Sequence, residues 1–169
     1  MKYISSDTNI WLDFYVINKL ELPFRLDYVY LMHYETVDQE VISPPELCER
    51  LLNYGLEKTD MTFDEYFDVP VLASKYPKLS KFDRIALSIA KHRSITLLTG
   101  DKPLRNAAEK EGVAVIGSIG ILDELYRNEF ISNDEYLCCL NDFLKHDERR
   151  LPTEEIRKRI KEIEEKGCD

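Results

Sequence analysis

The stretch that decides the fold runs from residue 80 to residue 117 and reads SKFDRIALSIAKHRSITLLTGDKPLRNAAEKEGVAVIG. From Ser80 to Arg93, apolar side chains recur at i, i+3, i+4, i+7 and i+8, which predicts a helix packed on a sheet. ITLL (95–98) predicts a central strand. KPLRNAAEKEG (102–112) predicts a helix with an early proline and a glycine stop, and VAVIG (113–117) predicts another strand. This alternation predicts an α/β fold.

The rest of the chain continues this alternation of short apolar runs and longer amphipathic stretches. KYIS (2–5) and DYVYLM (27–32) predict two more strands, with a helix from about Asn9 to Leu20 between them. Residues 35–42 predict a short helix that stops before a pair of prolines. The remaining predicted helices are PELCERLLNYG, SIGILDELYRNEF, NDEYLCCLNDFLKHD and a closing helix from about Thr153 to Lys166, with Gly167 beyond its end.

The length and composition of the chain limit what it can be. With 169 residues, 44% of them hydrophobic, it has the size of one domain and enough apolar side chains for a sizeable core. No apolar run approaches the roughly 20 residues that span a bilayer, and the amino end lacks the apolar stretch of a signal peptide. We therefore expect a cytoplasmic protein without a membrane partner. Residues 1–150 should form one domain, and residues 151–169 its helical C-terminal extension.

The charge of the chain is unevenly distributed. A formal net charge of -9 weighs against a generic nucleic-acid binder, because phosphate affinity comes largely from Lys and Arg. Residues 80–117, however, carry 7 basic and 4 acidic side chains, a net charge of +3. The cations of this region that could contact phosphates are Lys81, Arg84, Lys102 and Arg105. Each of them, taken singly, is equally well explained as a surface charge at a helix end.

The cysteines and histidines form no metal-binding pattern. Cys48, Cys138, Cys139 and Cys168 contain no CxxC pair, and the adjacent Cys138 and Cys139 would diverge on a helix. We expect all four to be reduced thiols. The three histidines are separated from one another by more than fifty residues, so no pair shares a helix face. A metal in this chain would have to be bound through oxygen.

Two aspartates lie directly after predicted parallel strands, Asp7 after KYISS and Asp101 after ITLLTG. Ligands of open α/β sheets bind outside the carboxyl ends of the strands, so these side chains are expected to converge. Hard divalent cations such as Mg²⁺ and Mn²⁺ prefer carboxylate oxygen, and the pair could share one. Each aspartate also precedes a predicted helix, so simple N-capping is the alternative explanation.

Residue chemistry alone gives weaker support to two further acids. Asp83 follows Ser80 at the spacing of a capping box, so a helix start would explain it as well as a metal site would. Glu40 lies in an acidic stretch with Glu35 and Glu46, and such stretches are usually solvated faces. Nothing in its chemistry separates Glu40 from these neighbours.

The order and surroundings of these acids resemble the PIN-domain family. SSDTNIWLDF (5–14) is similar to the family's opening strand with its first aspartate, which maps onto Asp7, and to a DTN step in which Asn9 supports the site. ETVDQEV (35–41) resembles the helix whose glutamate faces the metal, which maps onto Glu40.

The two most specific motifs lie in the middle of the chain. KFDRIALSIAKHR is similar to the family's D-x-x-A-x-x-x-A helix, which assigns the third acid to Asp83. ITLLTGDKPLRNAAEKEGVAVIG resembles the strand, TxD turn, helix and strand that carry the last acid, Asp101, with Thr99 as a supporting residue. VIGSIGILDELYRNEFIS is similar to the continuation found in PIN proteins related to VapC toxins.

The resemblance covers nearly the whole chain and implies a three-layer α/β/α fold around a mainly parallel sheet. It implies cleavage of RNA by water that a Mg²⁺ or Mn²⁺ ion activates, with Asp7, Asp83 and Asp101 as metal ligands and Glu40 as a ligand or base. It also implies an antitoxin protein as a partner and a tendency to form homodimers. An acidic, insert-like stretch from Lys58 to Leu79 and the helical tail beyond Leu151 depart from a compact toxin.

Other functions fit less well. A phosphatase of the haloacid dehalogenase class also begins with a strand that ends in aspartate and later uses a GD step, but it requires DxD where this chain has Asn9. A phosphate-accepting receiver domain needs an acidic pair on the first strand, which is missing here. A binding module that keeps the PIN scaffold and acts through a partner, with its acidic tail docking another chain, is the alternative from a different class.

Overall fold

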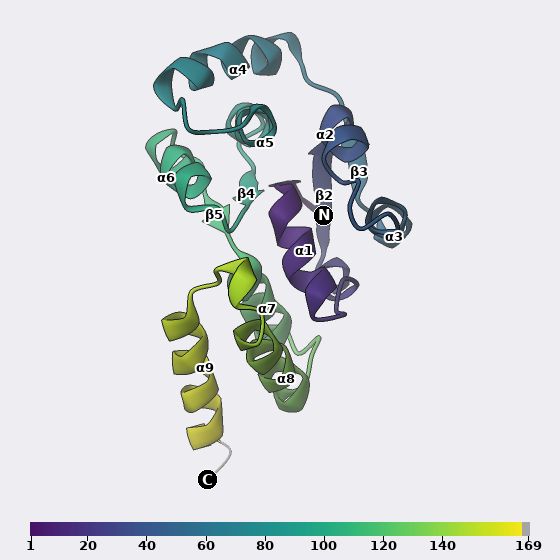
Figure 1. The fold of residues 1–169 in the computed structure, drawn as a ribbon, viewed down its shortest axis with the longest axis vertical. Coiled ribbons are helices and arrows are strands. Elements are labelled where there is room, and N and C mark those ends of the chain that lie inside the picture. Colours follow the sequence, from purple (N-terminus) through teal and green to yellow (C-terminus); the bar gives the residue numbers. More distant parts are fainter. Residues whose placement is uncertain (167–169) are drawn as a thin grey trace.

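Five parallel strands form the centre of the molecule in the computed structural model, which describes residues 1–166 (Figure 1). The strands are β1 (Lys2–Ser6), β2 (Tyr28–His33), β3 (Glu57–Thr59), β4 (Thr96–Leu98) and β5 (Val115–Ile116). Their order in the sheet is β3-β2-β1-β4-β5, and all neighbours are parallel. The chain therefore extends the sheet first on one side of β1 and then on the other. The junction of β1 and β4 is the topological switch point, where ligands of such sheets bind.

Helices cover both faces of this sheet, so the predicted three-layer α/β/α fold is confirmed (Figure 1). One face is covered by α4 (Phe63–Lys75), α5 (Lys81–His92) and α6 (Lys102–Lys110). The opposite layer contains α1 (Thr8–Val16), α2 (Tyr34–Gln39), α3 (Leu47–Tyr54), α7 (Ser118–Arg127), α8 (Asn133–Leu144) and α9 (Thr153–Lys166). Two short 3-10 helices, η1 (Leu22–Arg25) and η2 (Asp147–Arg149), lie in connections.

Neighbouring residues of the central strands point into different layers. In β4, Leu97 packs with α4, α5 and α6, whereas Leu98 packs into the opposite core. In β1, Ile4 belongs to that opposite core, and the Ser5 hydroxyl donates to the Ala86 carbonyl oxygen of α5 at 2.9 Å. Because both faces are buried, these strands lack the polar and apolar alternation of a half-exposed strand.

Most of the predicted elements lie where the patterns placed them, but the first helix is shorter than predicted. It ends at Val16 rather than near Leu20, because Asn18 adopts a left-handed backbone conformation with φ of 55°. The closing helix runs from Thr153 to Lys166, and its Ile156 and Ile163 are buried in the main core.

The remaining expectations for the tail and the thiols can be compared only in part. Gly167 and Cys168 lie outside the described residues. The other three cysteines are free thiols, and Cys139 is the buried one. No helix within residues 1–166 combines the length and the apolar character needed to cross a bilayer.

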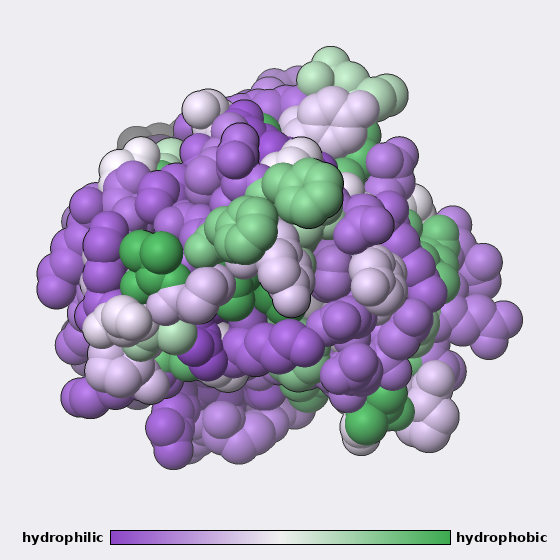
Figure 2. All heavy atoms as spheres, turned by 90° about the horizontal axis from the view of Figure 1, so that it is seen from above, coloured by the Kyte–Doolittle hydropathy of each residue, from purple (hydrophilic) through white to green (hydrophobic). Residues whose placement is uncertain are grey.

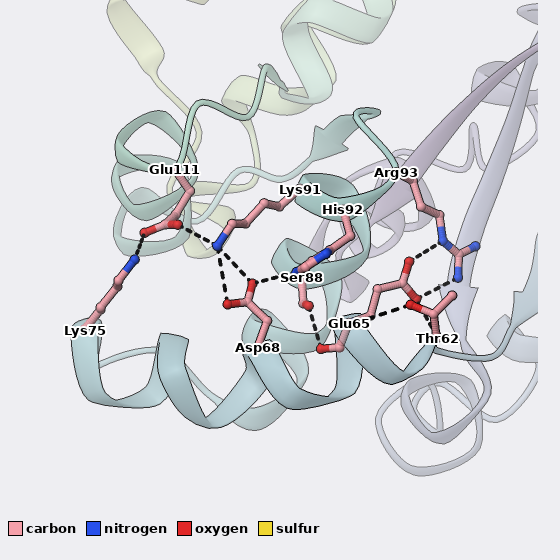
Figure 3. A network of polar contacts seen from close by, with 9 residues as sticks. All are labelled: Thr62, Glu65, Asp68, Lys75, Ser88, Lys91, His92, Arg93 and Glu111. Carbon is pink, nitrogen blue, oxygen red and sulfur yellow. Dashed lines mark hydrogen bonds and ion pairs between the residues drawn. The ribbon is translucent and has the colours of Figure 1, made fainter.

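The insert-like stretch over residues 58–79 contains secondary structure that was not predicted, namely most of the edge strand β3 and the helix α4. The strand was missed because its three residues, EKT, are all polar and join the sheet through their backbone. The helix was missed because its apolar side chains face outward (Figure 2), while polar contacts attach its inner face to α5 (Figure 3). A capping box between Thr62 and Glu65 was the available sequence signal for its start.

Candidate active site

Four carboxylates from separate segments meet at the carboxyl ends of β1 and β4. Asp7 directly follows β1, and Asp101 follows β4 at the start of α6. Asp83 lies in the first turn of α5, and Glu40 is the residue after α2. They are close enough for their charges to interact, because Asp83, Glu40 and Asp101 each raise the pKa of Asp7. The fold thus gathers the four acids that were singled out in the sequence.

Asp7 is the most deeply buried member of this four-carboxylate site, with 5% of its surface exposed. It occupies the N-cap position of α1, but its side chain caps no backbone N–H, so capping does not explain it. Its Oδ2 instead accepts a hydrogen bond from the Thr99 hydroxyl at 3.0 Å. Burial, and then the charge of Asp83, raise the pKa of Asp7 to about 7, although the Thr99 bond lowers it. Within the part of the chain that the structure describes, no cation is among the groups that shift this pKa.

Thr99 joins the ends of the two central strands. Its side chain is fully buried, and its Oγ1 both donates to Asp7 and accepts a hydrogen bond from the Asp101 backbone N–H at 3.1 Å. It therefore fixes the positions of the first and last acids relative to each other. The Thr99 carbonyl oxygen accepts from the Arg105 guanidinium at 3.2 Å, which links the site to α6.

Asp83 and Asp101 do serve as helix caps, as the alternative explanation proposed. Asp83 forms a capping box with Ser80, in which each side chain accepts a bond from the other residue's backbone N–H, at 2.8 and 3.1 Å. Asp101 Oδ2 accepts from the Leu104 N–H at 3.0 Å. The caps use Oδ2 of each carboxylate, so capping orients these groups without occupying both oxygens. Burial raises the pKa of Asp83 despite its bonds to Ser80, and Asp101 raises it further.

The position of Glu40 in the fold distinguishes it from Glu35 and Glu46, the acids near it in the sequence. Its Oε2 accepts a hydrogen bond from the hydroxyl of Thr8 at 2.7 Å, and Thr8 is the residue that follows Asp7. Burial raises the pKa of Glu40, and the charge of Asp83 adds to this increase. Glu35 forms an ion pair with Lys81 at 2.6 Å, and Glu46 accepts from the Tyr15 hydroxyl. Among these three acids, Glu40 is the one whose pKa responds to the charge of the site.

The donor set fits a hard divalent cation, although the side chains are not in a ligating arrangement. Within residues 1–166, no three His, Cys, Asp or Glu side chains stand together as a metal-binding group. Each of the four acids is held by a hydrogen bond from Thr8, Ser80, Thr99 or Leu104. Four carboxylates at interaction distance around a buried Asp7 nevertheless supply the all-oxygen, negatively charged surroundings that Mg²⁺ and Mn²⁺ prefer.

A cleft of about 1060 Å³ opens beside Asp101. Lys102 and Arg105 line it, as does Asn9, the residue expected to support the site. The other two candidate phosphate contacts do not line this cleft, since Lys81 pairs with Glu35 and Arg84 donates through Nε to the Ser80 carbonyl oxygen. Two of the four cations singled out in the sequence therefore face this cleft.

The sequence reasoning missed Asp13, a buried acid in the wall of this cleft. Its Oδ2 accepts a hydrogen bond from the Ser118 hydroxyl at 2.6 Å, and its Oδ1 accepts from Arg149 Nε at 2.8 Å. Arg149 also donates to the Asn9 carbonyl oxygen at 2.8 Å. The sequence signal for Asp13 was its position on the buried side of the first helix, three residues after Ile10. Its partners, Ser118 and Arg149, lie more than a hundred residues away in the sequence.

Comparison with known families gives one result. A family model described as a PIN domain matches residues 3–165. No curated protein and no solved structure gives a significant match. The matched range includes all four acids, the cleft and nearly all of α9.

Proposed function

Because the chain belongs to the PIN-domain family, whose members are generally nucleases, we propose that it is a metal-dependent endoribonuclease. Asp7, Glu40, Asp83 and Asp101 would hold the cation, Mg²⁺ or Mn²⁺. The observation that carries this proposal is the convergence of these acids around Asp7, a buried carboxylate whose pKa is raised to about 7. PIN domains generally bind divalent metals, and a cation would relieve this accumulation of negative charge.

The chain's own residues have separate tasks in this proposal. A bound cation would activate water and stabilise the charge that develops on the phosphate. Asp7 is the central ligand because it interacts with the other three acids, and Asp83 and Asp101 flank it on helix starts that fix their orientation. Glu40 acts as a further ligand or as a base. Thr99 holds the first and last acids at a fixed separation.

RNA is the proposed substrate because the cleft beside the acids carries cations despite the negative charge of the whole chain. Lys102 and Arg105 line it next to Asp101, where they could hold the phosphates on either side of the cleaved bond. Two of the seven basic residues of 80–117 thus lie at the cleft. The rest of the acidic surface would repel a polyanion and leave this cleft as its entry point.

We further propose that the protein acts as the toxin of a toxin–antitoxin pair. This rests on the likeness of residues 115–132 to the continuation of VapC-related PIN proteins. Induced expression should then arrest growth, and co-expression of the neighbouring gene product should restore it. Growth that continues normally while the wild-type protein cleaves RNA would contradict the toxin role and leave the nuclease assignment intact.

The test of the nuclease assignment is Asp101→Asn. Asparagine can cap α6 as aspartate does, so the substitution removes charge while it preserves the helix start. We expect wild-type protein with Mn²⁺ to cleave a mixture of single-stranded and structured RNAs, and we expect chelator or Asp101→Asn to reduce the rate about 100-fold or more.

The matched control is Asp27→Asn, which alters an exposed aspartate just before β2, at the opposite end of the sheet. Cleavage that Asp101→Asn leaves unchanged would refute the assignment of this site. Hydrolysis of small phosphomonoesters in place of RNA would favour the phosphatase. Specific binding of a protein partner, with no hydrolysis of any substrate, would favour the binding module.

Thr99→Val is expected to reduce cleavage by roughly 10- to 100-fold, the usual cost of removing a residue that orients a metal ligand. Valine keeps the volume of threonine but removes the hydroxyl that donates to Asp7 and accepts from Asp101. The rate should be measured over a series of Mn²⁺ concentrations, because the midpoint of activation should rise. Thr96→Val, in the strand β4 that precedes Thr99, is the control, and equal rates and midpoints for both variants would contradict this role.

A further inference from the structure

The cleft beside the four-carboxylate site has two walls, one from the middle of the sequence and one from its C-terminal part. One wall is the start of α6, with Lys102, Arg105 and Asn106. The facing wall is the turn at residues 148–152 together with Glu155 and Arg159 of α9. The C-terminal segment therefore does more than cover the core, because it completes the cleft that leads to Asp101.

Some of the cations that line the cleft are paired with acids of the protein, and others are not. Arg149 and Arg159 are neutralised within the fold, the first by Asp13 and the second by Asp123 and Glu155. In the part of the chain that the structure describes, Lys102, Arg105 and Arg150 form no ion pair, and all three line the cleft. The cleft thus presents positive charge from both sides, which suits an extended polyanion.

Arg149 explains how the turn is kept in place. Its guanidinium reaches the buried Asp13 carboxylate at 2.8 Å and the Asn9 carbonyl oxygen at the same distance. The next residue, Arg150, has a positive φ of 53° and an exposed side chain. Arg149 therefore fixes the backbone of the turn, and this places the side chain of Arg150 at the cleft.

We propose that Arg150 binds a phosphate of single-stranded RNA from the C-terminal wall, opposite Lys102 and Arg105. This inference rests on the proposed function and adds a second wall to the substrate site. Flexible single strands fit such a cleft because they can place successive phosphates against both walls. Backbone contacts of this kind provide affinity and position rather than sequence preference.

The test measures RNA binding separately from cleavage. Binding of a fluorescein-labelled 12-nucleotide RNA to the full chain is followed by anisotropy in chelator at several salt concentrations. Arg150→Ala should weaken binding roughly fivefold and lower the slope of log Kd against log salt by about 0.7, the value for one phosphate on a single strand. Arg150→Lys should restore most of the slope. Arg157→Ala, an exposed arginine of α9 that does not line the cleft, should have no effect.

The outcomes distinguish this inference from the nuclease assignment. Equal affinity and slope for Arg150→Ala, Arg157→Ala and the wild type would overturn the inference, whether or not Mn²⁺-dependent cleavage is observed. Loss of binding in Arg150→Ala without any cleavage by the wild type would retain the binding cleft and reject the nuclease. Melting curves of each variant ensure that only folded proteins are compared.

A second inference concerns α4, which turns polar side chains toward α5 and apolar side chains toward the solvent. The face that packs on α5 is held mainly by polar contacts (Figure 3). The fully buried Glu65 is bound by Arg93, its carbonyl oxygen accepts from the Ser88 hydroxyl at 2.7 Å, and Asp68 pairs with Lys91 at 3.0 Å. A surface helix normally turns its apolar side toward the core. This helix turns its apolar side away.

The outward face of α4 carries an aromatic stripe, defined by Phe63, Tyr66, Phe67 and Val71. Their exposed fractions are 83%, 63%, 65% and 48%. Figure 2 looks onto this side of the molecule and shows apolar groups gathered in the middle of a hydrophilic surface. With roughly 150–250 Å² per aromatic side chain, the stripe exposes on the order of 500 Å² of apolar surface. A patch of this size is comparable to the largest apolar patch of a typical monomer, and such patches often serve as interaction sites.

We infer that a second copy of this chain covers the aromatic stripe through a two-fold, antiparallel pairing of α4 with its counterpart. Charges at the ends of the helix favour this occupant, since Asp64 lies near its start and Lys78 beyond its end, and neither forms an ion pair within the described residues. Antiparallel pairing brings the acidic start of one copy to the basic end of the other. Two stripes would together bury about the 1,000 Å² expected of a specific interface. Phe67 lies in the middle of the stripe, so in a two-fold pairing it would contact Phe67 of the second copy.

The oligomeric state of the full chain tests this inference. Sedimentation at micromolar concentration should give a dimer for the wild type and a monomer for Phe67→Glu, because like charges would face each other across the two-fold axis. Phe130→Glu, at an exposed apolar residue outside α4, should remain dimeric. Phe67→Cys should form an interchain disulfide on mild oxidation to an extent that the wild type does not. A monomeric wild type, or a dimer that Phe67→Glu leaves intact, would overturn the inference, and in the latter case another protein would be the candidate occupant.

Discussion

Asp7→Asn is expected to lower RNA cleavage by about 1,000-fold or more and, in chelator, to make the protein more stable than the wild type. Both effects have the same cause. The Asp7 carboxylate is buried next to three other acids, which raises its pKa from 3.8 to about 7. A residue that binds metal is stabilised by the cation, but without the cation its charge opposes folding. Asparagine keeps the shape of the side chain and removes that charge.

The sign of the pH dependence follows from the raised pKa. Between pH 4 and pH 7 the folded protein binds a proton at Asp7 more tightly than the unfolded chain does, so stability falls as the pH rises. Above pH 7 the full penalty applies, and a difference of about three pH units corresponds to roughly 4 kcal/mol at most. The advantage of Asp7→Asn in chelator should therefore be largest at pH 8 and small near pH 4.

Thermal melting in chelator and in Mn²⁺ at several pH values measures this effect. Mn²⁺ should raise the melting temperature of the wild type and leave that of Asp7→Asn nearly unchanged, because the central ligand is missing. Asp27→Asn should behave like the wild type in both conditions. A wild type that matches Asp7→Asn in chelator at pH 8, or an equal Mn²⁺ shift in both proteins, would contradict the account.

Arg93→Ala is expected to have the largest effect on stability, a loss of about 3–5 kcal/mol. The guanidinium of Arg93 makes two bonds to Glu65, at 2.6 and 3.0 Å, and two more to Thr59 and the Asp60 carbonyl oxygen. It thereby connects β3 and α4 to α5. Burial alone would raise the pKa of Glu65, but the bonds from Arg93 and the Thr62 N–H outweigh it and lower that pKa. Without Arg93, a carboxylate that is 1% exposed would lose its counter-charge.

Denaturant unfolding of single and double variants checks this prediction. Glu65→Gln in the Arg93→Ala background should recover part of the loss, since it removes the isolated buried charge. Arg25→Ala, at an arginine on the surface, serves as the control and should cost about 1 kcal/mol or less. A loss below about 1 kcal/mol for Arg93→Ala would show that the connection between α4 and α5 does not depend on this pair.

The central part of the fold could be predicted because local and global signals agree there. Residues 80–117 combine helical periodicity, capping residues and short buried strands, and the structure places α5, β4, α6 and β5 accordingly. The segment that contains β3 and α4 could not be predicted in this way. A polar edge strand needs only its backbone to join the sheet, and a helix with buried acids and exposed aromatics reverses the pattern on which the prediction depends.

The candidate site shows a similar division. Asp7 and Asp101 could be found from strand ends, because the carboxyl ends of adjacent parallel strands meet in every such sheet. Residue chemistry could not distinguish Glu40 from Glu35 or Glu46. The difference arises in the fold, where Glu40 accepts a hydrogen bond from Thr8 and the charge of Asp83 raises its pKa. The contact of Asp13 with Arg149 spans 136 residues, and no local pattern predicts it.

Anomalous diffraction from crystals of the full chain grown with Mn²⁺ tests directly whether the four carboxylates bind a divalent cation. We expect a manganese peak bound by Asp7 and by at least one of Asp83 and Asp101, with the same peak missing in crystals of Asp7→Asn. The Asp83 or Asp101 side chain should bind the metal through Oδ1, the oxygen that does not cap the helix. A peak bound elsewhere on the protein, or no peak at these acids at a saturating concentration of Mn²⁺, would contradict this expectation.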